Sequence, residues 1–77
     1  MDDLERRQER VAFLRGRIDR ELAQARMVGA ADRKAHTDRI LSLRRELEPL
    51  DPNRAQLVLM DLMDLEQEWA EERQRRG

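Results

Sequence analysis

The residue types that most often carry chemistry are scarce in this chain. The sequence has one histidine, His36, one serine, Ser42, and no cysteine. A zinc site of the usual kind needs several His or Cys ligands, so a single histidine excludes it. Ser42 has no base near it in the sequence, and the scattered glycines form no phosphate-binding loop. We therefore predict that the protein is not an enzyme and binds no metal and no cofactor.

His36 itself fits a structural role. It lies on an apolar stripe one helical turn before Ile40. Buried polar groups in proteins are almost always hydrogen-bonded. The pattern therefore predicts a buried or boundary histidine bonded to a carbonyl or a carboxylate.

A basic face near the amino end is a second candidate site. At about 100° per residue, one helical face, roughly opposite the apolar stripe, carries four arginines around the only phenylalanine. The residues of this Arg face are Arg6, Arg10, Phe13, Arg17 and Arg20. Such a face suits a phosphate backbone or an acidic helix. However, Asp2 and Glu9 lie at its margin and the net charge is −1, so a solvated face, an acidic protein and nucleic acid all stay open.

An apolar excess near the carboxyl end is the third candidate. Leu57, Val58, Leu59 and Met60 form a continuous apolar run, and Met63 follows. A helix that is apolar over more than half its circumference must be covered on more than one side. Met-rich surfaces are adaptable, and Trp is enriched at interface hot spots. We predict a partner or oligomer interface formed by Leu57, Leu59, Met60, Met63 and Trp69. Acidic residues line the same helix: Asp61, Asp64, Glu68, Glu71 and Glu72.

Three helices are expected to position these groups. Their predicted ranges are 2–28, 32–48 and 52–74. Gly29 is a natural end for the first helix and Pro49 ends the second. Asp51 before a proline is typical of a helix start. Asp32 and Thr37 are rival N-caps for the second helix.

Each predicted helix has an apolar stripe at near-heptad spacing. The stripes are Leu4, Val11, Leu14, Ile18, Leu22 and Ala25; His36, Ile40, Leu43 and Leu47; and Ala55, Val58, Leu62, Leu65 and Trp69. Short loops favour antiparallel neighbours. We predict an all-α fold, a small antiparallel three-helix bundle with coiled-coil-like packing, as a single domain over 1–77. Unequal helix lengths leave Leu4 uncovered and carry Trp69 past the end of the first helix; a homodimer would cover both.

The bulk composition limits the class of protein. Hydrophobic residues make up 39% and charged residues 43% of the chain. Near-zero net charge with periodic apolar residues favours an ordered chain over a disordered one. No apolar run approaches a membrane span, and the acidic start is unlike a secretory signal, so we expect a cytoplasmic protein with no membrane partner. A Met start followed directly by a helical pattern leads us to expect a complete small protein.

These patterns together predict a protein–protein interaction module. We expect a homodimeric adaptor, regulator or inhibitor that binds a larger protein through the apolar face of the third helix. The alternatives are a nucleic-acid accessory protein that uses the Arg face and a structural or assembly component. The chain resembles the short Arg/Glu-rich helical bundles that recur among bacterial and phage accessory proteins. No motif assigns it to a family.

Overall fold

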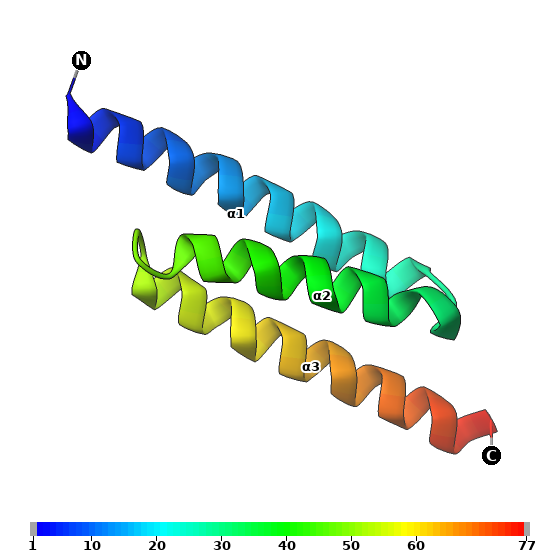
Figure 1. Cartoon of the computed structure of the whole chain (residues 1–77). Coiled ribbons are helices and arrows are strands. Elements are labelled where there is room, and N and C mark those ends of the chain that lie inside the picture. Colours follow the sequence, from blue (N-terminus) through cyan, green and yellow to red (C-terminus); the bar gives the residue numbers. More distant parts are fainter. Residues whose placement is uncertain (1, 77) are drawn as a thin grey trace.

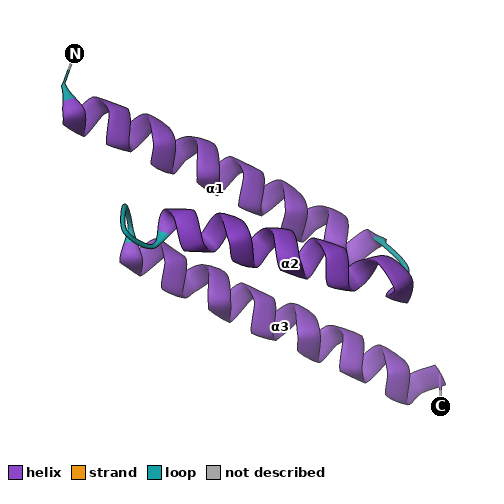
Figure 2. Cartoon of the chain, viewed as in Figure 1, coloured by secondary structure: helices purple, strands orange, loops and turns teal. Residues whose placement is uncertain are grey.

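The computed structural model describes residues 2–76, so Met1 and Gly77 lie outside the description. It contains three helices, α1 (Asp3–Met27), α2 (Ala30–Leu47) and α3 (Pro52–Arg76), and no strand among the described residues. The helices lie side by side with alternating direction in an elongated bundle of 56 × 19 × 14 Å (Figure 1, Figure 2). The all-α three-helix fold predicted from the apolar stripes is confirmed.

Two of the three helix starts carry a side-chain cap. The Asp2 carboxylate accepts a hydrogen bond from the backbone N–H of Leu4 at 3.2 Å. The Asp51 carboxylate accepts one from the N–H of Arg54 at 3.1 Å, directly before Pro52. Each cap satisfies one of the four N–H groups that a helix start leaves without an intrahelical partner. The predicted start of α3 at an Asp-Pro pair is therefore confirmed.

The start of α2 was predicted wrongly. Gly29, in extended conformation, is its N-cap and makes no side-chain cap hydrogen bond, while Val28 caps the end of α1. Asp32 lies inside the first turn, where its N–H donates to the Gly29 carbonyl at 3.1 Å, and Thr37 lies well inside the helix. Two alanines follow Gly29, and alanine has the highest helix propensity. The helix therefore begins as soon as the chain has turned.

The core is built from all three predicted stripes. The buried apolar residues are Leu14, Ile18, Leu22, Ala25, Ile40, Leu47, Ala55, Val58, Leu62 and Leu65. Val11, Leu43, Leu50 and Trp69 pack against the margin of this cluster. The contact between α1 and α2 is closer than either contact with α3. Only one side of α3 is therefore used by the rest of the chain.

One of the two predicted consequences of unequal helix length is confirmed. Leu4 is 57% exposed, at the end of α1 that projects beyond the turn between α2 and α3 (Figure 1). The carboxyl end of α3 also extends past the end of α1 (Figure 1), while Trp69 itself packs against the margin of the core. Arg33, in the first turns of α2, lies over the Trp69 ring, 5.0 Å from its centroid.

Candidate functional site

The outer face of α3 exposes large apolar side chains. Met63 is 67% exposed, Met60 53% and Leu57 46%, while Leu59 is half-buried. Four of the five residues predicted for an interface thus reach the surface. The fifth, Trp69, belongs to the margin of the core.

The outward positions of α3 repeat at alternating intervals of four and three residues. We call this set the outer seam: Gln56, Met60, Met63, Gln67, Ala70 and Gln74. None of its members is charged, in a chain of which 43% is charged. This is the spacing of a coiled-coil seam. The apolar pattern of the sequence predicts the two methionines but not the glutamines, which carry no hydrophobic signal.

Acidic side chains border most of the outer seam. The flank residues directly beside it are Leu57, Asp64 and Glu71 on one side and Leu59, Glu66 and Arg73 on the other. Asp64 and Glu66 are exposed and make no ion pair with any described residue. Among the described residues, Glu71 pairs only with Arg75 of its own helix, at 3.9 Å. The outer seam therefore has apolar neighbours at its start and mainly acidic neighbours along the rest of its length.

Trp69 helps to close the bundle within the chain. Arg33 of α2 lies over its ring and also forms an ion pair with Glu72 of α3 at 2.7 Å. A cation stacked on a desolvated Trp face is stabilising by about 0.5–2 kcal/mol. The Arg33 guanidinium therefore occupies one face of the indole, while the ring stays partly exposed, so its predicted role at an interface remains a prediction.

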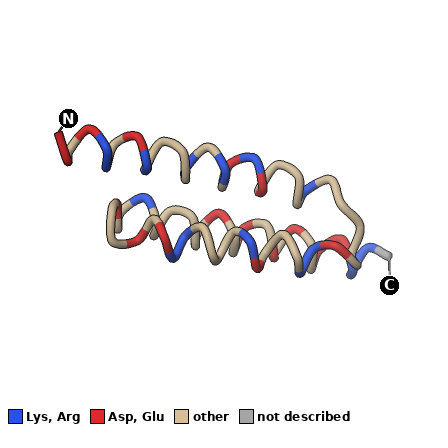
Figure 3. The backbone as a smooth tube through the Cα atoms, turned by 45° about the horizontal axis from the view of Figure 1, so that its top comes forward, with Lys and Arg blue, Asp and Glu red and all other residues tan. Residues whose placement is uncertain are grey.

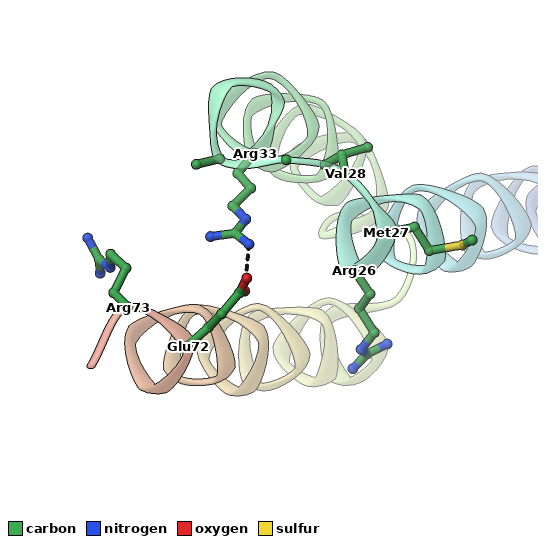
Figure 4. Close-up of a pocket in the computed structure, with 8 residues that line it drawn as sticks. Arg26, Met27, Val28, Arg33, Glu72 and Arg73 are labelled. Atoms are coloured by element: carbon green, nitrogen blue, oxygen red, sulfur yellow. Dashed lines mark hydrogen bonds and ion pairs between the residues drawn. The ribbon is translucent and has the colours of Figure 1, made fainter. Parts of the chain in front are cut away.

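A hollow of about 350 Å³ opens at this end of the bundle. Figure 4 shows Arg26, Arg33 and Arg73 around it, with Arg33 bonded to Glu72. The Arg33 Nε atom is buried and has no hydrogen-bond partner among the described residues. However, Arg26 approaches Glu68 at 3.6 Å, so carboxylates already offset two of the three guanidinium charges.

The Arg face of α1 is exposed but partly engaged. Arg10 forms an ion pair with Glu46 of α2 at 2.9 Å. The guanidinium carbons of Arg10 and Arg17 lie 5.4 and 5.9 Å from the centroid of the Phe13 ring. The predicted placement opposite the core is therefore wrong in part, because this face borders α2. Figure 3 shows basic and acidic residues interspersed along all three helices.

The acidic residues of α3 divide between two environments. Glu68 pairs with Arg26 of α1 and Glu72 with Arg33 of α2, so these two hold the helices together. Asp64 and Glu66, by contrast, are exposed beside the outer seam and form no ion pair with a described residue, although Glu66 also lines a hollow with Ala30 and Arg33 of α2. Asp61, Asp64 and Glu66 are thus the acidic residues of α3 without an ion pair to a described residue, and Asp64 and Glu66 lie beside the outer seam.

His36 lies in a buried polar cluster between α1 and α2. Its Nδ1 atom is 2.7 Å from Oε2 of Glu21, and both residues are buried. Arg39 donates to the same oxygen at 3.4 Å. The predicted buried histidine bonded to a carboxylate is confirmed. Its partner was not predicted, because Glu21 is distant in sequence and sits among apolar positions.

Two other kinds of site are absent from residues 2–76. No group of three or more His, Cys, Asp and Glu side chains is arranged to hold a metal ion. No described helix is long and apolar enough to cross a membrane. In comparisons with known proteins, no family model, curated protein or solved structure matches the chain.

Proposed function

We propose that the protein is a non-enzymatic protein-binding module that works as an adaptor, regulator or inhibitor through the outer face of α3. The observation that carries this proposal is the exposure of Leu57, Met60 and Met63 on a helix whose other face already forms the core. Residues three apart are neighbours on a helix, so Met60 and Met63 form one continuous surface. Contiguous exposed apolar surface on a small protein commonly marks an interaction site.

Within residues 2–76, no further helix is present to cover this surface. The inner face of α3 packs on α1 and α2 through Val58, Leu62 and Leu65. Both short connections lie at the ends of the bundle (Figure 2). A partner, either a second copy or another protein, is therefore the available source of cover.

The nucleic-acid alternative has less support. Arg10 is paired with Glu46, and two of the four arginines of the Arg face are stacked on Phe13. A phosphate backbone would have to compete with these contacts. A structural or assembly role would use the same outer face of α3 and would differ by growth beyond a dimer as concentration rises.

Affinity capture from the native host with a matched set of variants tests the proposal. The double variant Met60→Glu/Met63→Glu places two charges on the outer face and should lose the captured partner. Met27→Glu is the control, because Met27 is 87% exposed at the far end of α1. Circular dichroism should show the same helix content for all forms. A partner retained equally by the double variant would refute the proposal.

A further inference from the structure

We infer that the occupant of the outer face is one amphipathic α-helix of another protein, whose apolar seam is bordered by Lys and Arg. The inference rests on the proposed function and adds the chemistry of the partner. Its basis is the juxtaposition of an uncharged seam at coiled-coil spacing with unpaired acidic residues beside it. Neither feature alone would define the partner.

The shape of the outer face favours a helix as the partner. The seam runs from Gln56 to Gln74 on a continuous helix, which at 1.5 Å per residue spans about 27 Å. Its alternating intervals of four and three residues are those at which a second helix inserts side chains between those of the first. Partner helices of this kind bind through residues at i, i+3, i+4 and i+7.

The charge beside the seam favours a basic partner. In coiled coils the flanking positions select the partner and its orientation. Here they comprise the three acids Asp64, Glu66 and Glu71, with Arg73 as the only basic residue. Since Asp64 and Glu66 have no ion pair within the described chain, a partner can pair with them without displacing an internal contact. A helix with Lys or Arg at these positions and apolar residues opposite Leu57 and Leu59 fits this pattern.

A second copy of the chain fits the charge pattern less well. In an antiparallel pair that aligns the whole seam, Asp64 faces Asp64 of the other protomer, and Glu66 faces its own equivalent. In a parallel pair, Glu66 faces Glu71 of the other protomer. Like charges at flanking positions oppose pairing. Either homodimer therefore brings carboxylates together along the seam.

Two model peptides test the charge preference directly. Both are about three heptads long, with Leu at the seam positions; one has Lys at every flank and the other has Glu. Fluorescence anisotropy of the labelled peptides should show the Lys-flanked peptide binding the full chain at least ~10-fold more tightly at low salt. Asp64→Lys/Glu66→Lys should reverse this preference. Neither residue contributes an ion pair to the fold, so the variant should remain folded.

Neutral variants separate the charge inference from the proposed function. Met60→Gln/Met63→Gln should abolish binding of the Lys-flanked peptide without altering charge, and Met27→Gln should not. Equal binding of both peptides, lost in the double Gln variant, would overturn the basic partner and leave the docking face intact. A dimer seen by sedimentation that this double variant dissociates would make a second copy the occupant, again overturning the inference alone. Undiminished peptide binding by the double variant would overturn both.

Discussion

Both faces of α3 carry large apolar residues, but only one face is buried within the chain. On the inner face, Val58, Leu62 and Leu65 are 1%, 4% and 0% exposed, whereas Met60 and Met63 on the outer face are 53% and 67% exposed. The helix is the same and the residues interleave along it. The difference arises because two companion helices can cover only one side of a third. A periodic pattern of apolar residues therefore predicts that a helix face is covered. It does not tell whether the same chain or a partner covers it.

The residue types of the two faces also differ in a way that suits their fates. The inner face has Leu and Val, which pack closely against the core in a fixed arrangement. The outer seam has only Met, Gln and one Ala. Met adapts to different neighbours, and Gln stays hydrated when the face is open. The outer face can therefore stay in water in the free protein and still receive an apolar partner.

The largest expected effect tests the burial contrast itself. Leu65→Ala should lower the free energy of unfolding by about 2–5 kcal/mol, because it removes a side chain that is fully buried in the core. Met63→Ala, two residues earlier on the outer face, should change it by less than about 0.5 kcal/mol. Urea denaturation monitored by circular dichroism measures both.

Controls define how this contrast could fail. Leu65→Met preserves volume and should cost less than about 1.5 kcal/mol, so it keeps the comparison readable if Leu65→Ala is too unstable to fold. An equal loss for Met63→Ala and Leu65→Ala would mean that the outer face is permanently covered. The binding module would then be part of an obligate assembly.

The buried polar cluster tests whether the inner side must be wholly apolar. Glu21→Ala leaves the His36 imidazole buried without its 2.7 Å partner, which should lower the free energy of unfolding by about 1–3 kcal/mol. Glu21→Gln retains a hydrogen-bonding group and should lower the free energy of unfolding by a smaller amount. Thermal unfolding of the unmodified protein and the two variants measures the order of their stabilities. An unchanged stability in Glu21→Ala would show that water readily replaces the carboxylate.

The sequence predicted the parts of this fold that depend on local periodicity. The core stripes and the capped start at Asp51 follow from spacing and side-chain type alone. The start of α2 could not be predicted in this way, because its N-cap residue, Gly29, carries no capping side chain. The contacts of Glu21 with His36 and of Arg33 with Trp69 depend on how helices align, which no single segment encodes.

The candidate site was predicted in part for the same reason. Exposed Met60 and Met63 were expected from the excess of apolar residues on α3. The glutamines that complete the seam carry no hydrophobic signal, and the unpaired state of Asp64 and Glu66 depends on which arginines the other helices bring near. Only the assembled bundle separates acids that join helices from acids that border an open face.

The smallest expected effect concerns the other exposed face, the Arg face of α1. Arg10 and Glu46 are joined at 2.9 Å, with side chains 49% and 52% exposed. A double-mutant cycle of Arg10→Ala and Glu46→Ala should therefore give a coupling energy of only about 0.2–1 kcal/mol, which decreases as salt is added. The ion pair of Lys34 and Asp38 is more exposed, at 86% and 60%. The same double-mutant cycle on this pair is the reference and should give a still smaller coupling energy.

The outcome of that cycle decides how far the two exposed faces differ. A measurable coupling energy means that the Arg face stabilises the packing of α1 on α2. An anion that binds Arg10 would then have to displace Glu46 and lose that energy. A zero coupling that persists at low salt would free Arg10 for an external ligand. The nucleic-acid role would then stand beside the outer face of α3 as an equal candidate, and the contrast between an occupied and an open surface would be lost.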